Sequence, residues 1–289
     1  MNASSSRRAA FVALTYACVV AVGACGGKSS NSSSPTAPTS SSSSSGGASG
    51  SGSSGGNACG AISGFTGTPE TIYNGTDCNA QMATTSVVWL YLLDANGSAI
   101  KWCSGTVIDT QWVLTAAHCL SSDVKGVAAW LGAGMPVTAT EFHASPAYNG
   151  MGSTSLDVGV VKFEAALGRP VVPLLTSREA TAGETGVIAG WGNGITVSDP
   201  SGVLRAGTVT IASTTTAYIQ SNYLPSGSNV CNGDSGGPLL LQQNGAWCVA
   251  GIISSTTTGC ISGSSDFAKV RYSGILNFIL GYVPNAAQR

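Results

Sequence analysis

Residues 228–238 read SNVCNGDSGGP, with Asp234 and Ser235 placed between glycines and Cys231 three residues before the aspartate. Glycine adopts backbone conformations that other residues rarely reach, so this stretch can form a rigid turn that presents one side chain. The same turn can direct the backbone N–H groups of Gly233 and Ser235 into one concavity, which suits the binding of a developing negative charge. A plain surface turn is the alternative interpretation.

The chain has two histidines, His118 and His143. A serine that acts as a nucleophile needs a base whose pKa is near neutrality and a buried carboxylate that orients this base. His118 lies in WVLTAAHC (112–119), and Asp157 opens the apolar run LDVGVVKF (156–163). A carboxylate in an apolar strand is costly without a partner, so Asp157 is a candidate partner for a histidine. A core histidine and a strand-capping aspartate are the plainer alternatives.

After Cys59 the apolar residues occur in short runs that are rich in β-branched and aromatic residues and are separated by Gly, Ser, Asn and Pro. This pattern favours antiparallel strands in a sandwich or barrel over βαβ units. The predicted strands are residues 87–93, 105–108, 112–117, 158–163, 186–192, 208–212, 238–241 and 247–254. From Ser273, the run SGILNFILGYV has apolar residues at helical spacing behind a serine N-cap and predicts a C-terminal α-helix.

The motifs TAAHC, LDVGVVKF and GDSGGP, in this order, resemble those of the chymotrypsin-like (trypsin-fold) serine endopeptidases. The resemblance extends from Cys59 to the C-terminus and includes AGWG at 189–192 and GIISSTTTGC at 251–260. It implies an all-β fold of two six-stranded antiparallel barrels of the chymotrypsin type, with the active site between them and a C-terminal α-helix. The first barrel would run to about residue 175 and the second would start at about residue 180.

The same resemblance assigns catalytic roles. His118 is expected to be the general base, Asp157 its orienting carboxylate and Ser235 the nucleophile, with the N–H groups of Gly233 and Ser235 as the oxyanion hole. His143 resembles a structural stretch of the family and is not expected to take part. The implied reaction is hydrolysis of peptide bonds through an acyl-enzyme.

The primary specificity pocket is also placed by the resemblance. Its base is expected at Asn229, six residues before the nucleophile, and its walls at Thr256 and Ser265. The base carries no carboxylate for a basic side chain, and the two wall side chains narrow the slot. We therefore expect a preference for small or medium uncharged residues before the scissile bond. Ser255 departs from the family, which usually has a tryptophan there lining the substrate strand.

Members of the family usually begin, after activation, with Ile-Val-Gly-Gly, whose ammonium group pairs with the aspartate before the nucleophile. IYNGTD (72–77) matches this pattern, so an ion pair between the Ile72 amine and Asp234 is expected. The preceding residues are PET, without Lys or Arg, so cleavage after Thr71 requires another specificity, which includes self-cleavage. The alternatives are a chain that stays intact with Asp234 held by another group, and a simple strand entry at Ile72.

The N-terminus resembles an export signal. Arg7 and Arg8 precede an uncharged run from Ala9 to Ala24, which predicts a signal peptide over 1–24. Its end, VGAC, resembles a bacterial lipobox with Cys25 as the lipidated residue, and ordinary cleavage near Ala24 is the alternative. The expected product is a bacterial, exported protein that is extracellular or anchored by lipid at the cell surface or outer membrane.

The remaining segments follow from composition. Residues 25–58 are nearly all Ser, Gly, Pro, Thr and Ala, which predicts a disordered tether. Residues 59–71 form a propeptide-like segment, and residues 72–289 form the peptidase domain.

Nine cysteines are present, and Cys18 and Cys25 belong to the leader. The resemblance implies disulfides between Cys103 and Cys119 and between Cys231 and Cys260. For the other three, Cys59 with Cys248 is the first expectation and Cys59 with Cys78 the alternative, so one thiol is left over. Because CxxC and CxxH spacings are absent after the leader, no metal site and no cofactor are expected.

Only 9% of the residues are charged and the net charge is −1, which argues against a nucleic-acid partner. Protein or peptide substrates, a monomer, and membrane contact only through the N-terminal lipid are expected. Two other classes stay open. A catalytically silent protein of the same fold could serve as a tethered binding module, and a surface adhesin would explain the tether but not the three motifs.

Overall fold

The computed structural model describes residues 58–63, 72, 75–78, 82, 84–150, 155–192, 202–224, 227–257 and 259–289. The predicted signal peptide, Cys25, Thr71 and all of the predicted tether except Ala58 lie outside the described residues. In the part of the chain that is described, no helix is long and apolar enough to cross a membrane.

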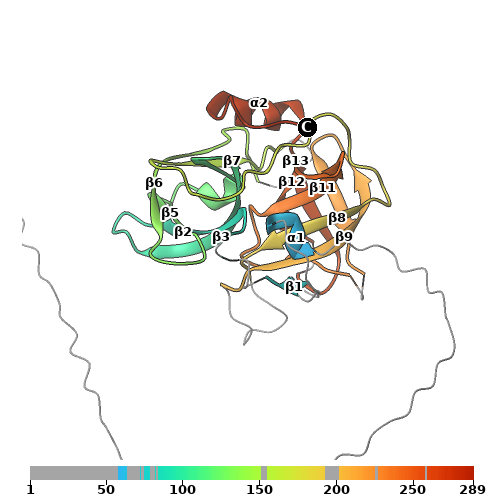
Figure 1. Cartoon of the computed structure of the whole chain (residues 1–289), viewed down its shortest axis with the longest axis horizontal. Helices are drawn as coiled ribbons and strands as arrows, with labels where there is room; N and C mark the ends of the chain where they lie inside the picture. Colours follow the sequence, from blue (N-terminus) through green and yellow to red (C-terminus); the bar gives the residue numbers. More distant parts are fainter. Residues whose placement is uncertain are drawn as a thin grey trace, which may run out of the picture. The chain divides into compact units, whose positions relative to one another are not determined.

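The first barrel is a closed antiparallel sheet, drawn from teal to green in Figure 1. Its strands are β2 (Val87–Leu93), β3 (Ala99–Asp109), β4 (Trp112–Thr115), β5 (Gly126–Trp130), β6 (Val137–Ala144) and β7 (Gly159–Phe163). The strands close in the order β2-β3-β4-β7-β6-β5. In β2, Leu90 and Leu92 are fully buried while Trp89 and Tyr91 are partly exposed, which is the two-residue alternation of a half-buried strand.

The second barrel follows in sequence and is drawn from yellow to orange in Figure 1. Its strands are β8 (Thr185–Gly190), β9 (Arg205–Thr214), β10 (Tyr218–Asn222), β11 (Pro238–Gln243), β12 (Ala246–Thr256) and β13 (Ser264–Lys269). They pair in the order β9-β10-β13-β12-β11-β8, and β8 also pairs with β9, which closes the sheet. The short strand β1 (Thr76–Asp77) adds to β9. The predicted fold of two six-stranded antiparallel barrels is therefore confirmed.

Each strand predicted from an apolar run overlaps an observed strand, and the run 87–93 matches β2 at both ends. The runs missed β1, β5, β6, β10 and β13. In β6, no residue is fully buried, so its sequence VTATEFHA lacks a continuous apolar signal. The strand β7 ends at Phe163, and β8 begins at Thr185.

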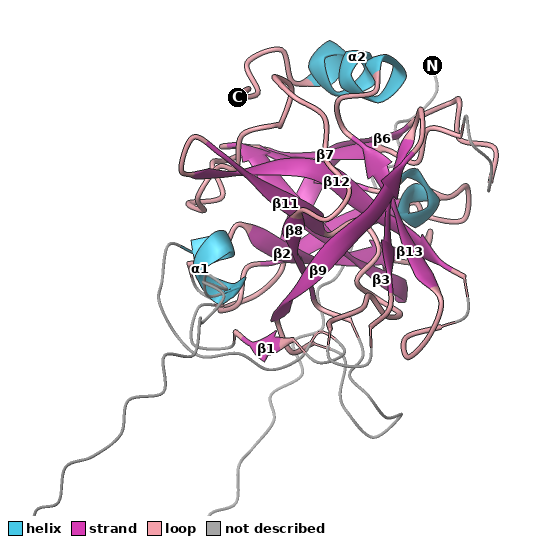
Figure 2. Cartoon of the chain, turned by 90° about the vertical axis from the view of Figure 1, so that its right-hand side faces the viewer, coloured by secondary structure: helices cyan, strands magenta, loops and turns pink. Residues whose placement is uncertain are grey.

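Among the described residues, two α-helices lie outside the barrels (Figures 1 and 2). In α2 (Ser273–Tyr282), Ile275 and Ile279 are one turn apart and buried, and the helix packs against β7. The expected serine N-cap was wrong, because Ser273 is the first helical residue and the N-cap is Tyr272, without a side-chain cap hydrogen bond. The other helix, α1 (Ala58–Ser63), contacts β8 and β9.

Candidate active site

His118 and Asp157 are brought together by the pairing of two strands in the first barrel. β4 is followed by a short 3-10 helix, η2 (Ala117–Leu120), that carries His118, and Asp157 lies two residues before β7. Because β4 pairs with β7, the end of the first faces the start of the second. Nδ1 of His118 lies 2.8 Å from Oδ2 of Asp157, and the backbone N–H of His118 donates to Oδ1 at 3.0 Å.

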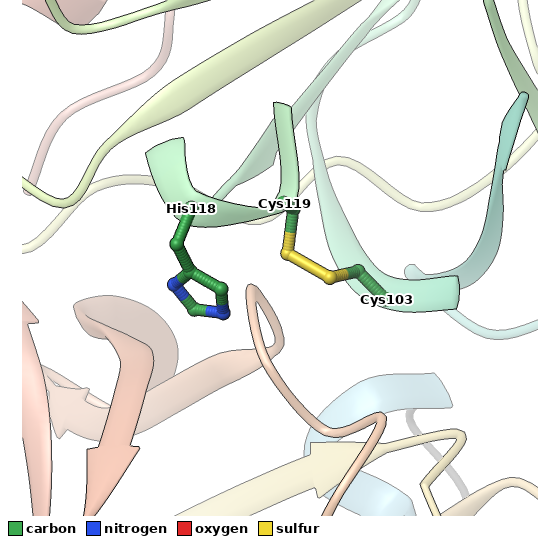
Figure 3. A group of neighbouring side chains, drawn as sticks. All are labelled: Cys103, His118 and Cys119. Atoms are coloured by element: carbon green, nitrogen blue, oxygen red, sulfur yellow. A yellow bond between two sulfur atoms is a disulfide. The ribbon is translucent and has the colours of Figure 1, made fainter. Parts of the chain in front are cut away.

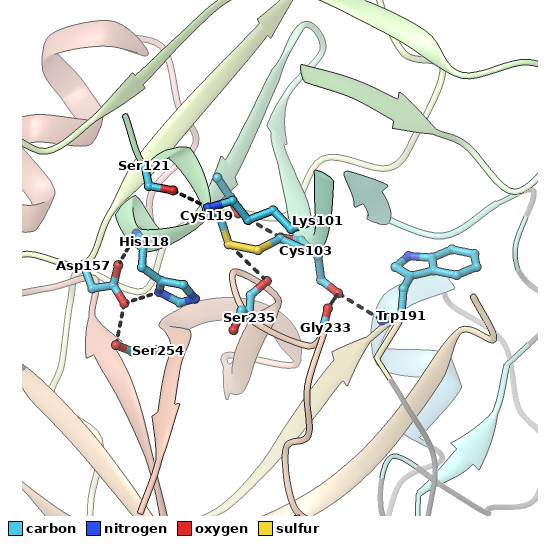
Figure 4. The surroundings of a disulfide bond; sticks show 12 residues. Lys101, Cys103, His118, Cys119, Ser121, Asp157, Trp191, Gly233, Ser235 and Ser254 are labelled. Carbon is cyan, nitrogen blue, oxygen red and sulfur yellow. Dashed lines mark hydrogen bonds and ion pairs between the residues drawn. A yellow bond between two sulfur atoms is a disulfide. The ribbon is translucent and has the colours of Figure 1, made fainter. Parts of the chain in front are cut away.

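The carboxylate of Asp157 is held from both barrels. It is 1% exposed, and the hydroxyl of Ser254, on β12, donates to its Oδ2 at 2.5 Å. A buried carboxylate without hydrogen-bond donors would be strongly destabilising. Here the backbone N–H of His118, its imidazole and the hydroxyl of Ser254 all form hydrogen bonds with the carboxylate. This arrangement fixes the imidazole so that it lies between Asp157 and Ser235 (Figure 4).

Ser235 lies in the turn before β11. The N–H of Asp234 donates to the carbonyl of Cys231 at 3.1 Å, and the N–H of Gly236 donates to the carbonyl of Ile253 at 2.8 Å. Gly233 has φ +92°, and a Cβ there would meet the indole nitrogen of Trp102 at 3.0 Å, so this position requires glycine. The turn is thus the rigid alternative of the two that the sequence allowed.

The structure gives no hydrogen bond between the hydroxyl of Ser235 and the ring of His118, two residues that it describes, although the imidazole lies next to this serine (Figure 4). In structures without substrate, such a bond is often long and tightens only in the complex.

Ser104, on β3 of the first barrel, holds the same turn. Its N–H donates to the carbonyl of Ser235 at 2.8 Å, and its hydroxyl donates to the carbonyl of Gly233 at 3.0 Å. The hydroxyl also accepts the N–H of Trp191 at 2.9 Å, and Ser104 is fully buried. One residue of the first barrel therefore fixes two carbonyls of the turn from the second.

Asp234 is buried, and its carboxylate points away from solvent. Oδ1 accepts the N–H of Gly192 at 2.9 Å, and Oδ2 accepts the N–H of Cys231 at 2.8 Å. Burial raises the pKa of Asp234 to about 6, opposed by these two N–H groups and by the positive charge of Arg205. Arg205 is itself buried and donates to the carbonyl of Gly192 at 3.1 Å.

The described structure is that of the uncleaved chain. Ile72 is 1% exposed and its carbonyl accepts the N–H of Gly75. Because the chain is continuous from Thr71 to Ile72, the Ile72 nitrogen is part of a peptide bond and is not an ammonium group. In this state the N–H groups of Gly192 and Cys231 and the positive charge of Arg205 stabilise the ionised carboxylate of Asp234.

The three residues expected to form the primary pocket fall into two groups. The amide of Asn229 donates to the carbonyl of Cys260 at 3.1 Å and accepts the hydroxyl of Ser265 at 2.5 Å, and both Asn229 and Ser265 are buried. Thr256 instead lines a cavity of ≈ 670 Å³ together with His118. The hydroxyl of Ser265 and the amide oxygen of Asn229 thus satisfy each other's hydrogen bonding. Neither side chain carries a charge.

Three disulfides occur among the described residues. The structure joins the two pairs that the resemblance implied, Cys103–Cys119 and Cys231–Cys260, and the third is Cys59–Cys78. The first expectation for Cys59 was wrong, because Cys248 is a buried free thiol. Cys59 lies on α1 and Cys78 directly follows β1, and both elements contact β9, which brings them together.

Cys103, His118 and Cys119 lie close enough together to suggest a metal site (Figure 3). The two sulfurs are joined to each other, however, so neither is available as the thiolate that a metal ion requires. The disulfide instead braces η2 against β3.

Two residues of this site were missed from the sequence, Ser104 and Ser254. Ser104 is a fully buried serine within β3, and Ser254 is a partly exposed serine that is followed by Ser255 in β12. Each donates to a residue of the predicted triad or its turn. A buried serine within a strand needs a hydrogen-bond partner, and for Ser104 this was the available signal.

Comparisons with known proteins identify the family of this chain. The family model described as Trypsin matches residues 73–279. Trypsin I-P1 of Gallus gallus is 33% identical over 208 residues, covering 64% of this chain and 78% of the relative. A trypsin-like protease of Streptomyces glaucescens is 26% identical over 203 residues, covering 58% of this chain and 72% of the relative.

A solved structure titled HL collagenase is similar in fold, with a TM-score of 0.58 and 21% identity, covering 69% of this chain and 93% of that chain. Because the family model spans more than half of the chain and the two barrels have the matching architecture, this chain belongs to the trypsin family of chymotrypsin-like serine endopeptidases.

Proposed function

We propose that the chain is an exported endopeptidase in which Ser235 is the nucleophile, His118 the general base and Asp157 the carboxylate that orients the base. The observation that carries the proposal is the buried Asp157 carboxylate, which receives Nδ1 of His118 at 2.8 Å and leaves Nε2 on the side of Ser235. A neutral imidazole with its proton on Nδ1 has a free lone pair on Nε2, as a general base requires.

The proposed reaction has two halves. Nε2 of His118 takes the proton of Ser235 as Oγ attacks the peptide carbonyl, and the oxyanion that forms accepts hydrogen bonds from the N–H groups of Gly233 and Ser235. His118 then gives its proton to the leaving amine, which yields the acyl-enzyme. In the second half, water attacks the ester, His118 accepts the proton of water and returns it to Ser235.

The test is labelling by a fluorophosphonate probe followed by mapping of the labelled peptide. Labelling of Ser235 in the wild-type protein and none in Ser235→Ala is expected, with strong loss in His118→Ala. Cleavage of casein should follow the same pattern. A wild-type protein that folds but neither labels nor cleaves, before and after processing at Ile72, would instead be a silent binding module of the same fold.

We extend the proposal to activation. Cleavage between Thr71 and Ile72 would turn the Ile72 nitrogen into an ammonium group, and Asp234 is the buried carboxylate proposed to receive it. Supporting this, the pKa of Asp234 is raised to about 6 by burial in the uncleaved chain, so a new positive charge beside it would be stabilising. N-terminal sequencing of active protein tests the site: a start at Ile72 is expected, and another start contradicts it.

For substrate preference, we propose small or medium uncharged residues directly before the scissile bond, with Asn229 at the pocket base. The uncharged pair of Asn229 and Ser265 supports this. For location, we propose export with a lipid on Cys25 and a tether to the enzyme. The three disulfides fit an oxidising compartment. Labelling of wild-type but not Cys25→Ala cells with an alkyne-tagged palmitate tests the lipid.

A further inference from the structure

A cavity of ≈ 670 Å³ lies next to the proposed catalytic centre, and Asn229 is not among the residues that line it. His118 lines one side of it, and Ser254, Ser255, Thr256 and Thr257 of the β12 edge line another. A cavity of this size is within the range of known ligand pockets and can hold an amino-acid side chain together with part of its backbone. The cavity is therefore placed to take part of a substrate that reaches Ser235.

Position 255 on the edge of β12 carries a small side chain, Ser255, which lines the cavity. Its hydroxymethyl group leaves the neighbouring strand β13 open to the cavity. Ser255 pairs with Asp266 of β13, and Asp266 is the residue that becomes part of the lining.

Asp266 gives the cavity a carboxylate. Its Oδ1 accepts the amide of Gln220 at 2.8 Å, and its Oδ2 accepts the hydroxyl of Ser255 at 3.2 Å. Gln220 is itself fixed by the hydroxyl of Ser213 at 2.8 Å. Both of these donors to the carboxylate are neutral, so its charge is oriented but not compensated by them. Each carboxylate oxygen has capacity for a further donor.

The walls suit a long side chain. Tyr148 and Tyr218 both line the cavity, and the hydroxyl of Tyr218 donates to the carbonyl of Ser155 at 3.0 Å. Burial, aided by the charge of Asp157, raises the pKa of Tyr218, so this phenol stays neutral at physiological pH. Neutral aromatic rings pack against aliphatic stems and attract cations over their faces.

We infer that this cavity is a second specificity subsite, in which Asp266 binds the cationic end of an arginine or lysine that precedes the residue held at Asn229. The inference rests on the proposed endopeptidase function. It assigns a basic preference to an earlier substrate position while the residue next to the scissile bond is uncharged. Arginine is favoured over lysine, since its planar fork can donate to both carboxylate oxygens.

The test uses processed full-length protein and a peptide cleaved by it, with arginine or its neutral analogue citrulline at each of the positions two to four before the cut. At one position we expect arginine to give a kcat/KM about tenfold above citrulline, as one charge-assisted pair would give. The ratio should fall to near one in Asp266→Asn. It should persist in Asp94→Asn, which changes an aspartate of the β2–β3 turn outside the cavity.

A second variant fills the space. Ser255→Trp should remove the arginine preference as well, by occupying the cavity while Asp266 stays in the chain, although the hydrogen bond from Ser255 to Asp266 is lost. Equal rates for arginine and citrulline in the wild type, or a ratio that survives Asp266→Asn, would overturn the inference.

A binding measurement separates this inference from the proposed function. The Ser235→Ala protein should bind the fluorescent arginine peptide about tenfold more tightly than the citrulline peptide, whether or not the wild-type protein reacts with a fluorophosphonate. Equal affinities there overturn the subsite alone.

Discussion

The hydroxyl of Ser104 donates a hydrogen bond to the carbonyl of Gly233 at 3.0 Å, across the boundary between the two barrels. The same oxygen accepts the N–H of Trp191, so one hydroxyl satisfies a buried donor and a partly buried acceptor of the second barrel. Gly233 supplies one of the two N–H groups of the proposed oxyanion hole. The hydrogen bond fixes the next peptide, between Gly233 and Asp234, which lies between the N–H groups of Gly233 and Ser235. The placement of both N–H groups therefore depends on a residue that is distant in sequence.

Ser104→Ala should slow catalysis and destabilise the fold. The N–H of Trp191 and the carbonyl of Gly233 would both lose a buried partner, which costs about 1–3 kcal/mol for each unsatisfied group. We expect kcat to fall about tenfold with KM nearly unchanged, measured on a short peptide ester. Ser221→Ala is the control for stability alone, because Ser221 is also a buried serine but lies on β10 of the second barrel. An unchanged kcat in a folded Ser104→Ala protein would show that the hydroxyl does not position the turn.

Ser254→Ala should also lower activity, through Asp157. The hydroxyl donates at 2.5 Å to the carboxylate oxygen that His118 also contacts. Hydrogen bonds to charged groups contribute about 1.5–3 kcal/mol, so kcat/KM should fall about 10- to 100-fold while the protein stays folded. Ser254→Thr keeps the hydroxyl and should restore much of the loss. Full activity in the alanine variant would argue that the backbone N–H of His118 and the imidazole are sufficient.

The barrels and the grouping of His118 with Asp157 could be predicted from sequence because their signals are local or belong to long motifs. Short apolar runs give strands directly, and TAAHC and GDSGGP carry the resemblance. The partly exposed strand β6 gave no such signal, since none of its side chains is fully buried.

Two other contacts between distant residues, the disulfide of Cys59 and the pairing of Ser255 with Asp266, could not be predicted in the same way. The partner of Cys59 depends on where α1 lies against β9, which no residue spacing reveals, and the spacing alone allowed Cys248. The cavity at Asp266 depends on the register of β12 with β13. Ser255 was noticed as a departure, but its consequence appears only when the facing strand is known.

Cleavage before Ile72 should not separate the two fragments. The Cys59–Cys78 disulfide spans this bond, so α1 and whatever precedes it stay attached to the peptidase domain. Purified cleaved protein should run as one species on a non-reducing gel and as two after reduction. Cys78→Ser should release the N-terminal fragment without reduction. A single species in Cys78→Ser after verified cleavage would mean that packing of α1 alone retains the fragment.

Alkylation should find a single reactive thiol among the cysteines that the structure describes. Cys248 is buried and unpaired, and burial raises the pKa of its thiol, so the native protein should resist iodoacetamide. After denaturation without reductant, mass spectrometry should find the label on Cys248 and on none of Cys59, Cys78, Cys103, Cys119, Cys231 or Cys260. Label on Cys59 or Cys78 instead would contradict the third disulfide.

The pH dependence of stability should reveal the state of Asp234. Its pKa rises from 3.8 to about 6 on folding of the uncleaved chain. Between these values the folded protein holds a proton that the unfolded chain has lost, so the free energy of unfolding falls as pH rises from about 4 to about 6. The expected loss is about 3 kcal/mol, at about 1.4 kcal/mol for each pKa unit.

Urea unfolding of the uncleaved Ser235→Ala protein at pH 4 and pH 7, compared with Asp234→Asn in the same background, measures this contribution. The decline should be smaller in Asp234→Asn, because an amide does not ionise in this range. The comparison uses the difference between the two pH values, since an amide offers only one oxygen to the two N–H groups of Gly192 and Cys231 and changes the absolute stability. After cleavage before Ile72, the decline should also shrink, because an ammonium group next to the carboxylate would lower its pKa. Equal declines with and without the Asp234→Asn substitution would show that Asp234 already carries its charge in the uncleaved chain, with Arg205 sufficient to stabilise it.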